Sequence, residues 1–200
     1  MDQRTIDIYN ADAEAFAREW EEDQAPPDDL RDAVSTFFRP GPTLDVGCGS
    51  GRDTAWLAAQ GYETLGVDAA PELLAEARRR HPDVTFAADE LPGLAGLGQR
   101  RFTNVLCETV IMHLPTPLAL EAARRLVDLL APEGALYLSW RVTEGADARD
   151  PAGRLYAAFS AAAVRQALGI QNLLMDERKV SASSKKIIHR MVLRAPEETC

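Results

Sequence analysis

T-L-D-V-G-C-G-S-G-R-D, residues 43–53, is the stretch that decides the fold of this chain. Residues 44–46 predict a buried β-strand, and the glycines after them predict a tight turn that leads into a helix beginning near Arg52 and ending at Gly61. Glycines at alternate positions allow positive φ and let a ligand approach the backbone, which a Cβ atom would obstruct. The unpaired N–H groups of the first helical turn favour an anion at the same corner. The stretch therefore predicts a cradle for a small ligand.

The glycine spacing distinguishes between two classes of nucleotide site. A dinucleotide-binding fingerprint reads G-x-G-x-x-G, and its third glycine packs the helix onto the strand. Here Arg52 stands at that third position, which argues against NAD. A second predicted strand, residues 63–67, ends at Asp68, and a carboxylate at the carboxyl end of a strand can accept both hydrogen bonds of a ribose diol. Together these features predict an adenosine site.

Four motifs, in this order, resemble those of class I S-adenosylmethionine-dependent methyltransferases. They are L-D-V-G-C-G-S-G-R-D from Leu44, G-V-D-A-A-P-E-L-L-A-E-A-R from Gly66, F-A-A-D from Phe86 and F-T-N-V-L-C-E-T-V-I-M-H-L-P from Phe102. The resemblance covers residues 41–140 in motif detail. It implies an α/β fold with a Rossmann-like, doubly wound, mostly parallel seven-stranded sheet, an antiparallel C-terminal strand and N-terminal helices.

The resemblance also implies a cofactor, S-adenosylmethionine, with S-adenosylhomocysteine as its product. The glycine turn would contact the methionine part, Asp45 would reach the ammonium group directly or through water, and Asp68 would hold the ribose. After a third predicted strand at residues 84–87, Asp89 or Glu90 would accept the amine of adenine. Capping of the loop is the alternative, and it applies to Glu90 more than to Asp89. The expected cofactor-binding residues are Asp45, Gly47, Cys48, Gly49, Ser50, Gly51, Arg52, Asp53, Asp68, Ala69, Ala88, Asp89, Glu90 and Cys107.

Two residues after the fourth predicted strand, residues 102–107, are candidate catalytic groups. Methyl transfer from a sulfonium is an in-line displacement, which depends on orientation and requires no covalent nucleophile or metal. A general base helps if the attacking atom carries a proton, and Glu108 and His113 are the candidates. A purely structural role for His113, capping or packing the turn before Pro115, is the alternative. Glu108 is costly to bury unless it meets solvent or a ligand.

The acceptor is expected to be a small molecule. The motif N-P-P-Y or D-P-P-Y, which in the family binds an exocyclic base amine, is absent, so methylation of nucleic-acid bases is not expected. The opening F-D-x-V of the fourth motif is F-T-N-V here, with Thr103 in place of a mainly structural aspartate. A net charge of −9, from 31 acidic and 22 basic residues, also disfavours nucleic acid as a partner.

Composition places the chain in the cytoplasm. No apolar run approaches the ~20 residues that cross a bilayer, and the N-terminus lacks the apolar core of a signal peptide, so we expect no membrane partner. Three cysteines fit a reducing compartment; Cys48 and Cys107 are expected to be small buried fillers, and Cys200 lies in the tail. The three histidines are dispersed and no C-x₂-C pattern exists, so no metal site is predicted.

The 200 residues suit one compact unit, with a helical cap at residues 1–40 and the methyltransferase domain at residues 41–200. Residues 4–22 predict one amphipathic helix and residues 30–38 a second. The first helix either packs on the edge of the sheet or acts as a lid. In the second case its substrate-binding residues would be Tyr9, Phe16 and Trp20.

A fifth predicted strand, residues 135–140, brings two more substrate-binding candidates to the carboxyl edge of the sheet. They are Trp140 and Arg141. Arg141 would either meet an acidic substrate or pair with a surface carboxylate. Residues 145–153 read as a polar loop on the substrate side.

The C-terminal part predicts a helix and a hairpin. Ser160 caps residues 161–168 and Gly169 ends them. Residues 172–180 and 186–194 read as two strands joined by a polar turn.

The leading hypothesis is a small-molecule methyltransferase. A second is a non-catalytic S-adenosylmethionine- or S-adenosylhomocysteine-binding protein with a regulatory or partner role, which observed methyl transfer would exclude. A third, a nucleotide-dependent oxidoreductase, is disfavoured by the glycine spacing. The sequence indicates neither the acceptor atom nor the oligomeric state.

Overall fold

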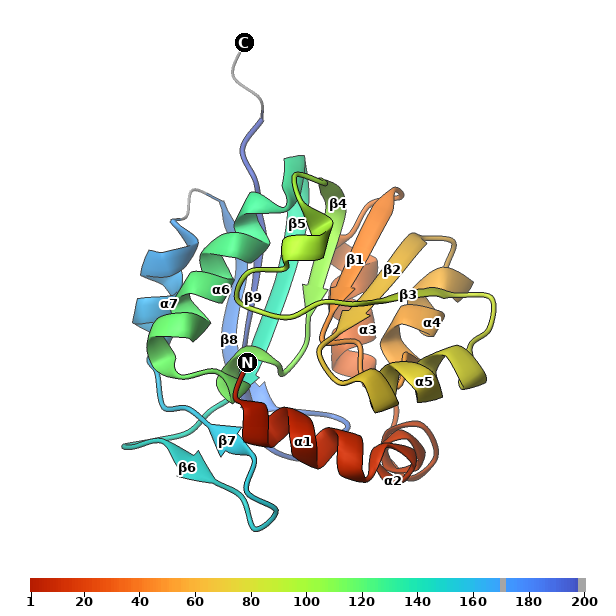
Figure 1. The fold of residues 1–200 in the computed structure, drawn as a ribbon. Coiled ribbons are helices and arrows are strands. Elements are labelled where there is room, and N and C mark those ends of the chain that lie inside the picture. Colours follow the sequence, from red (N-terminus) through yellow and green to blue (C-terminus); the bar gives the residue numbers. More distant parts are fainter. Residues whose placement is uncertain (170–171, 198–200) are drawn as a thin grey trace.

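A seven-stranded sheet forms the centre of the computed structural model, which describes residues 1–169 and 172–197 (Figure 1). Its strands are β1 (Pro42–Val46), β2 (Glu63–Asp68), β3 (Thr85–Ala88), β4 (Phe102–Cys107), β5 (Leu130–Arg141), β8 (Leu173–Val180) and β9 (Ile187–Arg194). They lie in the order β3-β2-β1-β4-β5-β9-β8. The first five are parallel, whereas β9 is antiparallel to both of its neighbours. The predicted mostly parallel sheet with an antiparallel C-terminal strand is confirmed.

Helices cover both faces of this sheet, as in a doubly wound fold. They are α1 (Gln3–Ala11), α2 (Ala13–Arg18), the π-helix η1 (Glu19–Asp23), α3 (Asp28–Phe37), α4 (Arg52–Ala59), α5 (Pro71–Arg80), the 3₁₀ turns η2 (Ala95–Leu97) and η3 (Ile111–His113), α6 (Thr116–Asp128) and α7 (Ala161–Leu168). One apolar cluster joins α3 and α4 to Leu106 and Tyr137, and another joins α6 and α7 to Val105 and Leu138. Successive strand residues point to opposite faces, so both sides of the sheet are buried.

The N-terminal segment differs from the single helix predicted for residues 4–22. Asp12, at φ −139° and ψ 39°, interrupts it and separates α1 from α2, and η1 follows. Asn10 and Asp12 are both poor residues for a helix interior, because their side chains compete for backbone hydrogen bonds. Figure 1 shows α1 and α2 crossing the end of the sheet at which the parallel strands finish. The cap residues therefore lie over the edge where ligands bind in α/β sheets.

The C-terminal helix and hairpin follow the predicted chemistry. The Ser160 hydroxyl accepts a hydrogen bond from the N–H of Ala163 at 3.1 Å, and Gly169 ends α7 with φ +64°. The loop predicted at residues 145–153 contains one strand of a small hairpin, β6 (Ala148–Arg149) paired with β7 (Leu155–Tyr156). Cys48 and Cys107 are buried, as expected, while Cys200 lies outside the described residues.

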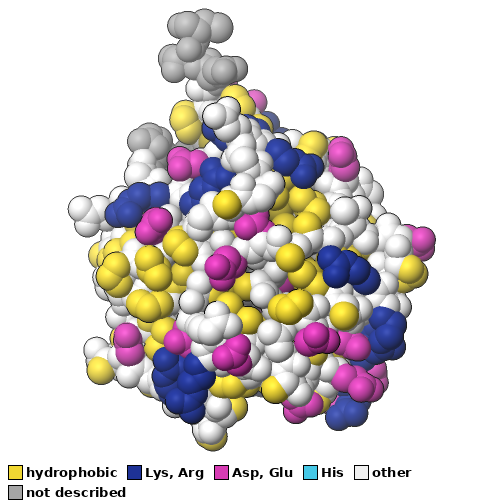
Figure 2. All heavy atoms as spheres, viewed as in Figure 1, with side chains coloured by type: hydrophobic (Ala, Val, Ile, Leu, Met, Phe, Trp, Pro, Cys, Tyr) yellow, Lys and Arg dark blue, Asp and Glu magenta, His cyan; other side chains and the backbone are white. Residues whose placement is uncertain are grey.

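Basic and acidic side chains are interspersed on the face shown in Figure 2. Within residues 1–169 and 172–197, no helix combines the length and the hydropathy that crossing a bilayer requires. The same part of the chain contains no group of three His, Cys, Asp or Glu side chains placed to hold a metal ion.

Candidate functional site

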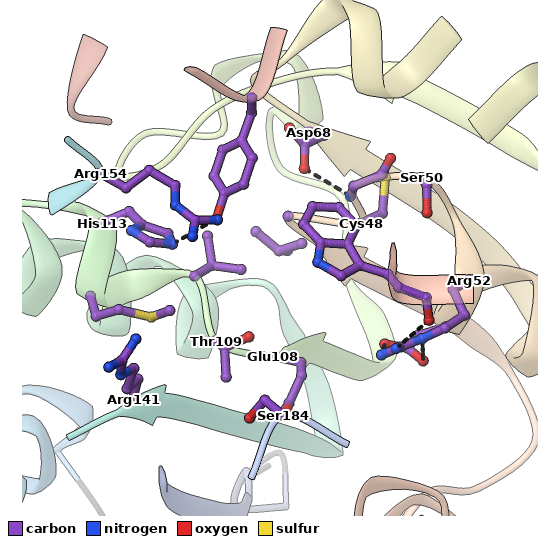
Figure 3. A pocket seen from close by; sticks show the side chains of 18 of the residues that line it. Cys48, Ser50, Arg52, Asp68, Glu108, Thr109, His113, Arg141, Arg154 and Ser184 are labelled. Atoms are coloured by element: carbon purple, nitrogen blue, oxygen red, sulfur yellow. Dashed lines mark hydrogen bonds and ion pairs between the residues drawn. The ribbon is translucent and has the colours of Figure 1, made fainter. Parts of the chain in front are cut away.

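A cavity of about 300 Å³ opens at the edge where the parallel strands end (Figure 3). Small-molecule sites occupy roughly 300–1,000 Å³, so this cavity lies at the lower end of that range. Its wall combines the residues after β1, β2, β3 and β4 with the N-terminal segment, the end of β5 and the turn between β8 and β9. The sheet order brings these distant segments together, since parallel strands end at one edge.

Most of the expected site residues line this cavity. From the expected cofactor-binding set these are Gly47, Cys48, Gly49, Ser50, Arg52, Asp53, Asp68, Ala69, Asp89 and Glu90. From the expected substrate and catalytic sets they are Tyr9, Trp20, Arg141, Glu108 and His113. The structure does not place Asp45, Gly51, Ala88, Cys107, Phe16 or Trp140 on the cavity wall.

The three turn glycines have positive φ: +75° at Gly47, +55° at Gly49 and +88° at Gly51. Each also lies close to a side chain of this protein. A Cβ on Gly47 would fall 2.3 Å from Val110, and one on Gly51 would fall 2.7 Å from the Phe86 ring. Gly51 thus serves the packing of the turn on β3, while the backbone of Gly47 remains on the cavity wall.

Asp68 is fixed at the end of β2 by two backbone donors. Its Oδ2 accepts the N–H of Gly49 at 2.9 Å, and its Oδ1 accepts the N–H of Ala70 at 2.8 Å. Burial raises the pKa of this carboxyl above its usual value, although the two N–H donors partly offset that effect. Each oxygen keeps a second lone pair, so the oriented carboxylate can still accept hydrogen bonds from a ligand.

Asp45 lies beneath the glycine turn and not on the cavity wall. It is 3% exposed, and its Oδ2 accepts the hydroxyl of Thr54 at 2.6 Å. Burial raises the pKa of its carboxyl to about 7. Asp45 is thus hydrogen-bonded to Thr54 of α4, and the glycine turn lies between its carboxylate and the cavity.

Two buried polar atoms of the expected site have no partner in the described part of the protein. The Ser50 hydroxyl belongs to a residue that is 1% exposed, and it makes no hydrogen bond. Asp89 accepts the N–H of Glu90 at 2.9 Å through Oδ1, while its buried Oδ2 is unpaired. Leaving such groups unpaired costs roughly 1–3 kcal/mol each, so both atoms suit a polar ligand. Arg52, which follows the glycine turn, donates two hydrogen bonds to the Asp53 carboxylate, at 3.0 and 2.9 Å.

Glu108 follows β4 and points toward the lower part of the cavity in Figure 3. It accepts a hydrogen bond from the Ser139 hydroxyl. Burial raises the pKa of the Glu108 carboxyl to about 7, and the Ser139 bond counters that shift. A carboxyl with a pKa near 7 can exchange a proton at physiological pH, as a general base must.

His113 is a neutral, fully hydrogen-bonded histidine. Its Nδ1 lies 2.6 Å from the carbonyl oxygen of Leu155, which only accepts, so Nδ1 carries the proton. Nε2 is then the acceptor for the Tyr9 hydroxyl at 3.1 Å. Burial lowers the pKa of His113 to about 4. The imidazole therefore orients Tyr9, and the single lone pair of Nε2 is already used by the Tyr9 hydroxyl.

Aromatic residues of the cap close one side of the cavity. Trp20 lies over the glycine turn, since a Cβ on Gly49 would be 2.8 Å from its ring. Phe16 stands behind the cavity wall, stacked on Trp20 at 5.5 Å and edge-on to Tyr9 at 5.0 Å. Arg154 lies over both Tyr9 and Phe16.

Trp140 is a core residue in the structure. It is 2% exposed and belongs to the apolar cluster beneath α6 and α7. Its ring stacks on His189 with centroids 4.7 Å apart. The reason is the alternation along β5, which points Trp140 to the same face as Leu138 and leaves Arg141 at the cavity.

Sequence reasoning did not identify a second group of cavity residues. These are Thr109, Met112, Arg154, Tyr156, Ser181, Ser183, Ser184 and Lys186. Arg154 and Tyr156 follow the loop that was assigned to the substrate side. The serines belong to the polar turn between β8 and β9, which reaches the cavity only because β9 lies beside β5.

Comparisons with known proteins agree with this geometry. Residues 43–134 match the protein family described as a methyltransferase domain. The ubiquinone biosynthesis O-methyltransferase of Xanthomonas campestris pv. campestris (strain B100) is 35% identical over 100 residues, which are 48% of this chain and 41% of that protein. The chain thus matches less than half the length of this relative.

Two solved structures share the fold over nearly the whole chain. The magnesium protoporphyrin IX methyltransferase of Synechocystis PCC 6803, solved with bound S-adenosylmethionine, has a TM-score of 0.74 at 20% identity over 98% of both chains. The 1,6-didemethyltoxoflavin-N1-methyltransferase of Burkholderia thailandensis has a TM-score of 0.67 at 22% identity, over 98% of this chain and 91% of that one.

The sheet order and the cavity at its carboxyl edge define a Rossmann-like α/β fold, which the solved methyltransferase structures share. The segment that matches the methyltransferase domain contains the glycine turn, Asp68 and Glu108. Residues 43–134 of this chain are therefore similar to a methyltransferase domain, within a fold that the solved methyltransferases share.

Proposed function

We propose that this protein transfers a methyl group from S-adenosylmethionine to a small-molecule acceptor by in-line displacement. The observation that carries this function is Asp68, a half-buried carboxylate fixed at the end of β2 on the wall of the cavity. Its position, within the segment that matches a methyltransferase domain, suits the two hydroxyls of a ribose. When bound, the cofactor supplies an electrophilic methyl group on a sulfonium.

The residues around Asp68 fit the rest of that cofactor. The backbone of the glycine turn and the unpartnered hydroxyl of Ser50 suit the methionine part. The unpaired Oδ2 of Asp89 suits the amine of adenine. Asp45 supports the turn through its hydrogen bond with Thr54, and a water molecule would connect its carboxylate to the ammonium group.

Glu108 is the proposed general base. It lines the cavity, and a pKa of about 7 leaves a useful fraction of carboxylate at neutral pH. His113 is proposed as a positioning residue, because its Nε2 is occupied by the hydroxyl of Tyr9. While it accepts this hydroxyl, Nε2 has no lone pair left for a proton from the acceptor. The acidic net charge of −9 supports a small-molecule acceptor over nucleic acid, and a cytoplasmic location remains part of the same proposal.

Calorimetry with S-adenosylhomocysteine and NAD tests this function directly. We expect S-adenosylhomocysteine to bind with micromolar affinity, about −8 kcal/mol, and NAD not to bind. Asp68→Ala should abolish binding, while Glu63→Ala, an exposed change at the opposite end of β2, should leave it intact. A thermal melt of each variant checks folding, because Asp68→Ala also frees the N–H groups of Gly49 and Ala70. Unchanged affinity in the Asp68→Ala variant would remove this carboxylate from the site.

Labelled methyl transfer to a panel of metabolites then separates an enzyme from a binding protein. We expect methylated product from at least one acceptor. Cofactor binding without transfer to any of them would favour a regulatory protein.

A further inference from the structure

Two basic side chains line the cavity without a carboxylate partner. Arg141 ends β5 and Lys186 precedes β9, and these strands are paired, with Arg141 opposite Ile188. Within residues 1–169 and 172–197, neither side chain forms an ion pair, whereas the other two arginines of the cavity do. Arg52 pairs with Asp53 and Arg154 with Asp150, at 2.9 and 2.7 Å. In a protein of net charge −9, two free cations at one end of a cavity indicate an anionic ligand.

Arg141 is held in position rather than left to solvent. Its guanidinium carbon lies 4.7 Å above the centroid of the Tyr156 ring, and that ring lies 5.1 Å from the His113 ring. Stacking on an aromatic face fixes the plane of a guanidinium and leaves its N–H donors free at the edge. Those donors match the paired oxygens of a carboxylate or a phosphate.

Hydroxyl donors accompany the two cations. Ser181, Ser183 and Ser184 all line the cavity from the turn between β8 and β9. The turn is closed by the N–H of Ser181 on the carbonyl of Lys186 at 2.9 Å. Figure 3 shows Arg141 and Ser184 across the cavity from Asp68, the carboxylate assigned to the ribose. Arg141 and the serine turn therefore lie at the end of the cavity away from Asp68, the end toward which Glu108 also points.

We propose that the methyl acceptor carries an anionic carboxylate or phosphate group, which Arg141, Lys186 and the serine turn of residues 181–186 bind. This substrate class rests on the proposed methyl transfer and extends it. The sequence left open that Arg141 pairs with a surface carboxylate. Within the described residues Arg141 forms no such ion pair.

Matched pairs of small probes test this site by NMR titration, with and without S-adenosylhomocysteine. The pairs are benzoate against benzamide and phenyl phosphate against phenol. We expect at least one anion to bind about tenfold more tightly than its neutral counterpart, and its affinity to fall as salt rises. The two anions distinguish a carboxylate site from a phosphate site. Equal affinity of both anions and their neutral counterparts, or no binding of any probe, would overturn the inference.

Variants assign the effect to the two cations. Arg141→Ala should remove the preference for the anion, Arg141→Lys should restore part of it, and Lys186→Ala should weaken it several-fold. Arg178→Ala is the matched control. It removes an exposed arginine of β8 that pairs with Glu144, and it should leave the preference for the anion unchanged. A preference that survives Arg141→Ala would contradict the proposal.

The affinity for S-adenosylhomocysteine separates the two proposals. Retained cofactor binding with no preference for anions would defeat only the acceptor class. Loss of cofactor affinity in Arg141→Ala would assign Arg141 to the cofactor and would also contradict the proposed acceptor class. Absence of cofactor binding to the unaltered protein would instead defeat the proposed methyl transfer.

Discussion

Glu108 shows how burial can turn an ordinary carboxyl into a base at neutral pH. Its pKa is raised to about 7 by burial, against a hydrogen bond from Ser139 that lowers it. The carboxyl is protonated below this pH and ionised above it. Methyl transfer that uses Glu108 should therefore become faster as the pH rises through about 7 and then level off.

Replacing Glu108 by glutamine tests this role. We expect Glu108→Gln to lower kcat by roughly 10²–10⁴-fold and to abolish the rise near pH 7, because an amide cannot take a proton. Its affinity for S-adenosylhomocysteine should stay within a few-fold of the original. Ser139→Ala is the companion variant: without the hydroxyl donor the pKa of Glu108 should rise further and shift the profile to higher pH. An unchanged kcat in Glu108→Gln would show that the acceptor needs no base from this residue.

The same pKa shift has a consequence for stability. Between pH 4.5 and about 7 the folded protein keeps a proton on Glu108 that the unfolded chain releases, so this group makes the free energy of unfolding fall as pH rises through that window. Glu108→Gln removes the effect. Between pH 5 and pH 8, the free energy of unfolding of the variant should therefore increase relative to that of the original protein by up to about 3 kcal/mol, which chemical denaturation measures. This readout does not depend on finding the acceptor.

At the scale of elements, the glycine turn and the cap meet at Gly49. Its φ of +55° disfavours any other residue, and a Cβ there would also lie 2.8 Å from the Trp20 ring. Gly169 at the end of α7 has a similar φ of +64°, but no atom lies within 4 Å of the position that its Cβ would take, so it isolates the backbone cost. We expect Gly169→Ala to lower the free energy of unfolding by about 1–2 kcal/mol. Gly49→Ala should cost about 1–3 kcal/mol more.

The Trp20 ring is the cause of that extra cost. In a Trp20→Ala background the cost of Gly49→Ala should therefore fall to that of Gly169→Ala, which a double-mutant cycle in urea measures. An equal cost of Gly49→Ala in both backgrounds would mean that the cap does not rest on the turn in solution.

Elements that are set by local patterns could be predicted from the sequence. Apolar runs and turn glycines predicted the strands and helices of residues 42–141, although β5 begins at Leu130 and not after the turn expected at residues 132–134. Ser160 and Gly169 predicted both ends of α7. The break at Asp12 was not predicted, because the apolar stripe continues across it and was weighed above the low helix propensity of Asn10 and Asp12.

Side-chain direction and sheet order explain the remaining differences in the candidate site. Trp140 was assigned by its place at the end of a strand, although the alternation of Leu136 and Leu138 already points it to the core. The serine turn could not be identified, since its position depends on β9 lying between β5 and β8. Asp68 and Glu108 come at the ends of apolar strands, and this pattern predicted that both would face a ligand. Both line the cavity in the structure.

At the scale of the whole molecule, the cap is attached to the rest by polar contacts and a small apolar cluster. Asp2 pairs with Arg149 at 2.9 Å, and the N-terminal amine donates to the carbonyl of Leu91 at 2.9 Å. The buried apolar residues of that cluster are Ile6, Ala13, Ala70 and Leu73, far fewer than those beneath α6 and α7. Exposed ion pairs contribute little, roughly 0–1 kcal/mol each. The cap should therefore open more easily than the core.

Hydrogen exchange can measure this opening. Because Tyr9 and Trp20 lie over the cavity, a cofactor that fills it should hold α1, α2 and η1 closed. We expect amides of these helices to exchange at least about tenfold faster than those of α6 in the free protein, and to slow by a similar factor with saturating S-adenosylhomocysteine. Amides of α6, which packs on the sheet away from the cavity, should change little and serve as the internal control. Cap amides that are already as protected as α6 without a ligand would show that the cofactor enters without displacing the cap.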